Sequence, residues 1–396
     1  MLDKRRRTPW VLAIIVFAQL AGTSLWFSGN AVLSELQEKF ALSTGLIGDI
    51  TTAVQVGFIV GTITFSLLTI SDRLSPSKVF FYSTFIGAIS NLSILLASGY
   101  TSLIIIRFVT GFTLAGVYPV GMKIAADWTE KGLGKALGLL VGALVLGTAF
   151  PHLIKGFFVS LPWGNILTIT SSIALFGGIL VLLFVPDGPF QKRRSAFSFK
   201  AIYDVFNVKS VRFLSYGYFG HMWELYTFWA FVPFMITYYK EIHPYTDLGV
   251  SLLSFFIIGI GSISCAIGGY LSSRFGSENV ALYSLILSLL CCLLSPFIFA
   301  LSPVLFITFL LFWGTVVISD SPQFSTLIAL YSPAIQRGTA LTIINGIGFS
   351  LTIVSIQLVN FLADYISTPY LFLLLAPGPA FGILSIYRMK WKQLIN

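Results

Sequence analysis

The chain has 396 residues, of which 56% are hydrophobic and 10% are charged, and its mean hydropathy is +0.89. Soluble globular domains carry about 25% charged residues, so this composition excludes a soluble enzyme or a soluble binding domain. The formal net charge of +9 would fit a nucleic-acid-binding protein. The basic residues are, however, distributed as in a membrane protein, so the net charge does not indicate a nucleic-acid partner.

Apolar stretches of 20 or more residues recur along the whole chain, and a helix of that length crosses a bilayer core of about 30 Å. A segment in lipid must satisfy its own backbone polar groups, so the sequence predicts an all-α polytopic membrane protein. We expect twelve transmembrane helices, at residues 9–34, 45–71, 77–98, 100–127, 132–158, 163–185, 211–240, 246–273, 279–300, 302–330, 336–363 and 368–388.

The two halves of the chain repeat each other. The string that begins at Gly134 returns 204 positions later at Gly338, and Tyr118-Pro119 is answered by Ser321-Pro322 after 203 positions. A third echo, Asp72-Arg73-Leu74-Ser75, returns 201 positions later as Ser273-Arg274-Phe275-Gly276. Near-constant offsets in one order predict two homologous bundles of six helices. In a membrane protein, such halves typically enclose a substrate site that opens alternately to each side.

The basic residues predict how the chain is oriented. With the N-terminus placed in the cytoplasm, 19 Lys and Arg residues fall on the inner side, 3 on the outer side and 2 within spans. This split follows the positive-inside rule and places both termini in the cytoplasm. The polar and basic segment 186–210 is then a cytoplasmic linker between the bundles 1–185 and 211–396. Short loops and short termini indicate a bacterial inner membrane.

These features resemble the major facilitator superfamily over nearly the whole chain. The loop from Asp72 to Lys78 is similar to the family's cytoplasmic signature between helices 2 and 3, although Leu68 and Ser75 replace two of its glycines. Helix 4 carries Arg107-x-x-x-Gly111, which is similar to a second family signature. In helix 5, Ala143 stands where the family's antiporter signature has proline. The resemblance implies the fold and leaves the subfamily open.

Few ionisable residues lie within the predicted spans, and each is costly in lipid, at about 2.5–3.5 kcal/mol on insertion scales. Arg107 has a planar guanidinium that suits a carboxylate or phosphate, so we expect it either to bind an anionic substrate or to tether helices. His221 and Glu224 are three residues apart and share a helix face. Such a pair favours a proton or substrate site, with a structural pair or a metal site as alternatives.

Asp320 precedes Ser321-Pro322 late in helix 10 and corresponds to the region of Pro119 in helix 4. A helix broken at proline exposes carbonyl groups that can bind a polar ligand; the alternative is an aspartate near the cytoplasmic end that meets water or a basic residue. Some polar and aromatic residues could line the substrate pathway with these groups. They are Trp26, Asn30, Tyr118, Trp223 and Tyr226.

A separate set of charged residues is expected to gate the pathway rather than to bind substrate. In the family, an acid at the end of helix 4 pairs with the basic loop between helices 2 and 3. Carried over, Asp127 would contact Arg73 near Lys78, and Asp72 would cap the N-terminus of helix 11, where the helix dipole favours an anion.

The sequence therefore predicts a monomeric secondary transporter for a small polar or anionic organic solute, most readily coupled to protons. No nucleotide-binding or nucleophile motif is found, so we expect no enzymatic activity and no cofactor, and an ion gradient must drive transport. The three cysteines lie in predicted helices and indicate neither disulfide nor metal site. Efflux of drugs or lipids is one alternative, and a membrane sensor is another.

Overall fold

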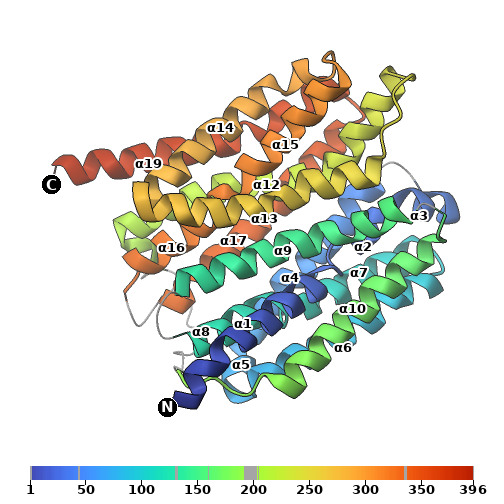
Figure 1. The fold of residues 1–396 in the computed structure, drawn as a ribbon. Helices are drawn as coiled ribbons and strands as arrows, with labels where there is room; N and C mark the ends of the chain where they lie inside the picture. The colour runs from blue at the N-terminus through green and yellow to red at the C-terminus, as the bar shows by residue number, and fades with distance from the viewer. Residues whose placement is uncertain are drawn as a thin grey trace. The chain divides into compact units, whose positions relative to one another are not determined.

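The computed structural model describes residues 2–42, 45–129, 133–158, 160–190, 203, 205–333 and 337–395. Throughout these residues every regular element is a helix (Figure 1), as the sequence predicts. The chain divides into two compact units, Met1–Ala196 and Phe197–Asn396, and the boundary falls within the segment 186–210.

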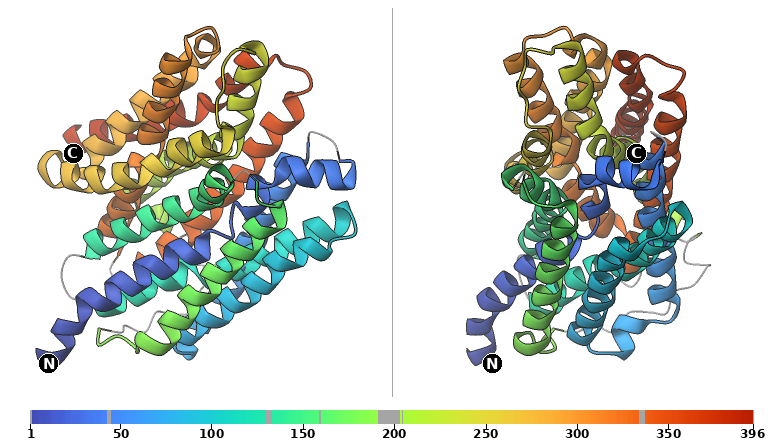
Figure 2. Two further views of the ribbon diagram at one scale, coloured as in Figure 1. Left: turned by 45° about the vertical axis from the view of Figure 1, so that its right-hand side comes forward. Right: turned by 90° about the vertical axis from the view of Figure 1, so that its right-hand side faces the viewer.

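Unit 1 is a bundle of long helices that lie side by side, coloured blue to green in Figures 1 and 2. Several predicted spans are interrupted and become two or three shorter helices. The helices are α1 (Leu2–Thr23), α2 (Ser28–Ala31), α3 (Leu33–Phe40), α4 (Leu46–Leu67), α5 (Ile70–Arg73), α6 (Pro76–Leu92), η1 (Ser93–Leu96), α7 (Tyr100–Leu114), α8 (Tyr118–Trp128), α9 (Leu133–Phe157) and α10 (Trp163–Phe184).

Unit 2 also consists of long helices, and its fourth and sixth spans are interrupted. Its first helix, α12, is longer than any in unit 1 and is not interrupted, although it contains Pro233. The helices are α12 (Lys209–Ile242), α13 (Val250–Phe275), α14 (Ser277–Ile298), α15 (Pro303–Ser319), α16 (Ser321–Tyr331), α17 (Arg337–Leu362), α18 (Thr368–Leu371), η2 (Phe372–Leu375) and α19 (Pro377–Ile395).

Two helix breaks lie at equivalent positions of the sequence repeat. α8 begins at Tyr118 with Pro119 in its first turn, and α16 begins at Ser321 with Pro322 in its first turn. Proline lacks the N–H that would continue the preceding helix, but it fits the first turn of a new one. The repeated Tyr118-Pro119 and Ser321-Pro322 pairs thus produce a repeated interruption of helices 4 and 10.

The first predicted span, 9–34, is not one helix. α1 ends at Thr23, residues 24–27 form a turn and a bend, and α2 begins at Ser28. No proline or glycine lies within 24–27, so the sequence pattern alone gives no sign of this break. Arg107 occupies the break from α7, which supplies a physical reason for it.

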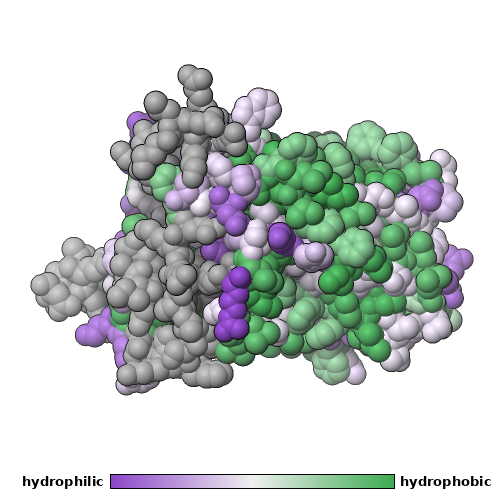
Figure 3. Space-filling view, turned by 90° about the horizontal axis from the view of Figure 1, so that it is seen from below, coloured by the Kyte–Doolittle hydropathy of each residue, from purple (hydrophilic) through white to green (hydrophobic). Residues whose placement is uncertain are grey.

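Ten helices in the described part of the chain are long and apolar enough to cross a membrane. The remaining two predicted spans are α1, whose apolar part is Thr8–Thr23, and α12, which carries several polar side chains. Large hydrophobic side chains such as Leu96, Phe157 and Phe297 are exposed, and hydrophobic atoms cover broad areas of the face in Figure 3. These are the surfaces of an integral membrane protein with twelve spanning segments.

Glycine permits the closest helix crossing in unit 1. A Cβ at Gly111 of α7 would collide with the backbone of Val54 in α4, and one at Gly57 of α4 would collide with the backbone of Phe108. Small residues allow the backbones of membrane helices to approach this closely. The crossing fixes α4 against α7 and so sets the position of Arg107.

Candidate functional site

Arg107 is fully buried in unit 1, and its guanidinium tethers α7 to the break between α1 and α2. Its Nη1 donates to the carbonyl oxygen of Leu25 at 3.1 Å and to Ser28 Oγ at 3.3 Å, and its Nη2 donates to the carbonyl oxygen of Trp26. Nε has no partner among the described residues. All these partners are neutral oxygens, so the buried positive charge has no described acid beside it.

The Arg107 site continues into a network of neutral polar groups. Ser28 Oγ donates to Asn91 Oδ1 of α6 at 2.5 Å, and Asn91 Nδ2 donates to Ser171 Oγ of α10 at 3.0 Å and to Thr170 Oγ1 at 3.3 Å. The network joins α2, α6, α7 and α10. It meets the requirement that buried polar groups find hydrogen-bond partners.

Trp26 and Asn30, both expected at the site, lie at the same break, Trp26 within it and Asn30 in α2. The ring of Trp26 lies 4.9 Å from that of Phe58 in α4, and Asn30 Nδ2 donates to Thr51 Oγ1 of α4 at 2.7 Å. Both residues are buried. The structure therefore brings together three of the residues that the sequence singled out in the first half.

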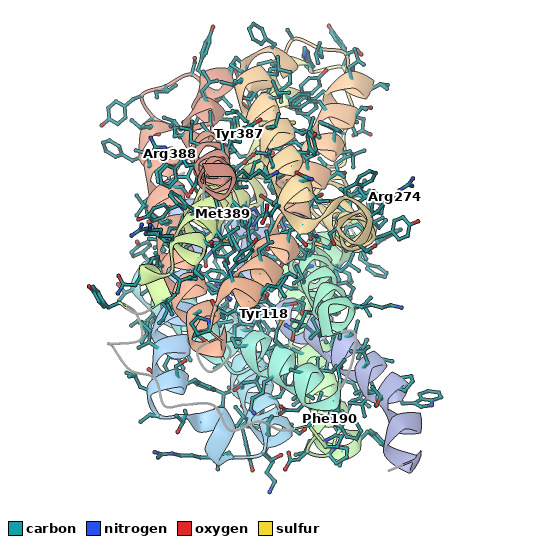
Figure 4. All side chains as sticks on the ribbon, turned by 90° about the vertical axis from the view of Figure 1, so that its left-hand side faces the viewer. Tyr118, Phe190, Arg274, Tyr387, Arg388 and Met389 are labelled. Atoms are coloured by element: carbon teal, nitrogen blue, oxygen red, sulfur yellow. The ribbon has the colours of Figure 1, made fainter. Side chains whose placement is uncertain are left out.

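Tyr118 is the first residue of α8, directly after the break in helix 4, and is half-buried. Figure 4 labels it, together with Arg274, whose side chain projects away from the ribbon of α13. Arg274 lies in the last turn of α13 and is exposed, so it is not part of a buried site.

In unit 2, three hydrogen-bond donors converge on Glu224 of α12. Its Oε1 accepts from Ser288 Oγ of α14 at 2.6 Å, from Cys292 Sγ of α14 at 3.2 Å and from Trp313 Nε1 of α15 at 2.7 Å. Glu224 is 1% exposed. The described donors are neutral, so the carboxyl group has no basic partner among them.

His221 contacts a different acid from the one expected. Its Nδ1 lies 2.8 Å from Asp320 Oδ1, and both side chains are almost fully buried. The His221–Glu224 pair is thus replaced by a His221–Asp320 pair, because Asp320 lies at the α15–α16 break, opposite α12. Asp320 is buried beside this histidine rather than in contact with solvent. Nε2 of His221 has no hydrogen-bond partner within the described segments.

Two other expected residues of α12 face different neighbours. Trp223 Nε1 donates to the carbonyl oxygen of Leu374 in η2 at 2.9 Å, so its indole packs on the C-terminal helices. The ring of Tyr226 is buried 5.2 Å from the rings of Trp229 and Phe349. Successive residues of a helix are separated by about 100° around its axis. Trp223 and Tyr226 therefore lie about 200° and about 140° from His221 and face away from it.

The gating residues are placed only in part. Arg73 and Lys78 are exposed, and the Asp72 side chain lies outside the described ones. Asp127 lies 3.2 Å from Lys123, one turn earlier on α8, and both are buried. This pair lies on one helix, so it does not test the expected contacts between Asp127 and the loop that contains Arg73.

Residues at the start of the predicted linker are bound to one end of unit 1. Ser77 Oγ donates to the carbonyl oxygen of Val185 at 2.6 Å, and Trp128 Nε1 donates to that of Pro186 at 2.9 Å. Loops assigned to the inner side thus lie together. Lys155 and Glu35, 2.8 Å apart, connect α3 with the end of α9 that is assigned to the outer side. In unit 1, these contacts join loops or helix ends that the distribution of Lys and Arg assigns to the same side.

A metal site finds no support in the described residues, which contain no group of three or more His, Cys, Asp or Glu side chains able to hold an ion. The three cysteines are free and buried. Cys292 serves instead as a donor to Glu224.

The fold agrees with the comparisons to known proteins. The model of the Major Facilitator Superfamily matches residues 12–356, and the chain belongs to this family of membrane transporters. A hexuronate transporter of Bacillus subtilis (strain 168) is 23% identical over 279 residues, which cover 66% of this chain and 64% of the relative, just under two thirds of its length.

Other similar proteins extend the comparison. A provisionally named metabolite transport protein of Haemophilus influenzae (strain ATCC 51907 / DSM 11121 / KW20 / Rd) is 27% identical over 132 residues, or 31% of this chain and 32% of the relative. The inward-facing, unoccupied crystal structure of a bacterial homologue of the human lysosomal transporter Spinster aligns with a TM-score of 0.69 at 13% identity, covering 96% and 94% of the two chains. The transporter FucP in its outward conformation aligns with a TM-score of 0.71 at 14% identity, covering 95% and 98%. These structures share the fold.

The sequence did not single out several residues that complete the two buried sites. They are Ser28, Thr51, Phe58, Asn91, Ser288, Cys292 and Trp313. Small hydroxyl and thiol groups are common in membrane helices, so their presence alone carries little signal. Only the packing of neighbouring helices in the structure reveals which of these small polar side chains contact a charged group.

Proposed function

We propose that this protein is a secondary active transporter that carries a small anionic organic solute by alternating access and is coupled to protons. Membership of the family supports transport. The relative called a hexuronate transporter supports a solute with a carboxylate group, because a hexuronate is a sugar acid.

The observation that carries the anionic assignment is the buried charge of Arg107. Its described partners are two carbonyl oxygens and a hydroxyl, which orient the guanidinium but do not neutralise it. An uncompensated cation within a membrane protein is costly. A carboxylate or phosphate on the substrate would offset this cost, and a guanidinium suits the geometry of either anion.

Proton coupling is supported by three titratable groups in the interior of unit 2. Glu224 accepts hydrogen bonds from neutral donors, and His221 lies 2.8 Å from Asp320. Glu224 and Asp320 are also near enough for their charges to interact. Acidic and histidine side chains within membrane helices characteristically form proton relays, so this cluster is the proposed proton site.

The test is solute flux into proteoliposomes with and without an imposed pH gradient, with labelled D-glucuronate as the probe. With one proton carried per solute, a gradient of one pH unit can drive about a tenfold accumulation, since 1.4 kcal/mol is a factor of ten. We expect the wild type to respond to the gradient. Glu224→Gln is expected to lose this response while retaining exchange of solute between the two sides.

Trp223→Phe is the matched control, because it removes a hydrogen bond from the same helix without touching the acidic cluster. Its flux should still respond to pH. Indifference of both the wild type and Glu224→Gln to the gradient, in vesicles that exchange solute, would exclude proton coupling. Absence of flux for all organic acids tested would contradict the anionic assignment.

A further inference from the structure

One face of α4 carries a stripe of side chains directed toward the α1–α2 break. Thr51, Gln55 and Phe58 are spaced by four and three residues, so they lie on the same side of the helix. Thr51 accepts a hydrogen bond from Asn30 of α2, and Phe58 contacts the ring of Trp26 in the break. Gln55 lies between them in sequence and therefore belongs to the same surface.

The carboxamide of Gln55 is fully buried, and neither its Nε2 nor its Oε1 has a hydrogen-bond partner in the described part of the chain. Asn30 is 7% exposed, and its Oδ1 is also without a described partner. Buried polar atoms are nearly always satisfied by protein, ligand or ordered water. Three such atoms on two adjoining elements therefore indicate a place for polar groups from outside the protein.

The chemistry of these side chains selects the kind of ligand. A carboxamide offers both donors and acceptors, and a hydroxyl group needs both, so amides are well matched to polyhydroxylated compounds. The rings of Trp26 and Phe58 add an apolar surface, against which the C–H face of a sugar can pack. Arg107, bound to the carbonyl of Trp26, supplies a positive charge at the same break.

We propose that Gln55 and Asn30, flanked by Trp26 and Phe58, form a subsite for the hydroxyl groups of a sugar-acid substrate. The subsite rests on the proposed function, and it narrows the solute from any organic anion to a polyhydroxylated carboxylate. Gln55 determines this specificity, and Arg107 supplies the charge attraction.

The test compares three six-carbon probes in thermal-shift and binding measurements on the purified full-length protein. D-glucuronate has both hydroxyls and a carboxylate, hexanoate has only the carboxylate, and D-glucose has only the hydroxyls. We expect D-glucuronate to bind at least tenfold more tightly than hexanoate. Gln55→Met keeps the length of the side chain but removes its amide, and it should weaken D-glucuronate about tenfold while leaving hexanoate unchanged.

Gln323→Met is the matched control, because Gln323 is an equally buried amide in unit 2. It should bind all probes as the wild type does. Without ligand, Gln55→Met should melt no lower than the wild type, since the removed amide has no described partner, whereas a purely structural role would lower its melting temperature.

Equal binding of D-glucuronate and hexanoate, or unchanged D-glucuronate binding by Gln55→Met, would overturn the subsite. Binding of D-glucose alone, if it depends on Gln55, would uphold the hydroxyl subsite and defeat the anionic part of the proposed function. Binding of none of the three would refute the sugar-acid assignment, while flux of another organic acid in vesicles would leave the transport proposal standing.

Discussion

Single buried charges are the most informative residues of this protein. Arg107 and Glu224 each have three hydrogen-bonding partners, yet no described partner of either carries the opposite charge. Charges without counter-ions are rare within membrane proteins because they are costly there. The hydrogen bonds orient both groups but do not neutralise them. An anionic substrate at Arg107, or a proton on Glu224, would offset the remaining cost of burying the charge.

Arg107→Met should destabilise the protein even without substrate. The substitution leaves the carbonyl groups of Leu25 and Trp26 without this donor, at about 1–3 kcal/mol for each unsatisfied group. Arg107→Lys should recover only part of the loss, since one ammonium cannot reproduce a planar fork. The measurement is the melting temperature in detergent. Ser28→Ala is the comparison: it removes the 3.3 Å contact with Arg107 and the hydrogen bond to Asn91 but leaves both bonds from Arg107 to the carbonyl groups, so it should lower the melting temperature less than Arg107→Met does.

Individual helices are positioned by small residues and by breaks. Gly57 and Gly111 allow the backbones of α4 and α7 to come into contact. That crossing holds Thr51, Gln55 and Phe58 of α4 beside the α1–α2 break. Proline lies in the first turn of α8 and of α16, so a new helix begins at Tyr118 in helix 4 and at Ser321 in helix 10. The candidate site of unit 1 thus depends on backbone geometry as much as on its polar side chains.

Gly111→Ala should therefore lower stability substantially, by about 1–3 kcal/mol or more, because the new methyl group would overpack against the backbone of Val54. Gly269→Ala on α13 is the control, because no described atom lies within 4 Å of the added Cβ. Alanine is the better helix former by roughly 1 kcal/mol, so this variant should be neutral or stabilised. Equal melting temperatures for the two variants would contradict the close crossing.

At the scale of the whole molecule, the chain is a member of the Major Facilitator Superfamily with two units, in which helices 4 and 10 are interrupted at matching positions. In unit 1, the loops group at two ends in the way that the distribution of Lys and Arg predicts. Which end faces the cytoplasm stays a prediction from the positive-inside rule.

Cysteine labelling can test this orientation, because all three native thiols are buried and should react slowly. In intact cells, a membrane-impermeant maleimide should label Lys39→Cys but not Lys78→Cys. After lysis, both should be labelled. Labelling of Lys78→Cys in intact cells, with Lys39→Cys protected, would reverse the predicted topology.

The sequence alone determined the class of protein, the approximate extent of each span and the internal repeat, because each depends on local composition and on the length needed to cross a bilayer. It did not show where spans such as 9–34 and 45–71 are interrupted. The sequence also located the few charged residues within the spans, because they are easily recognised among apolar residues and are costly in lipid.

Only the tertiary structure decided how these residues are partnered. In the structure His221 contacts Asp320, and Glu224 accepts hydrogen bonds from Ser288, Cys292 and Trp313. Arg107 binds a break in helix 1, at residues 24–27, that contains no proline or glycine. The physical reason is that such pairings join residues 64 to 99 positions apart, on helices whose neighbours are set by the packing of the whole bundle.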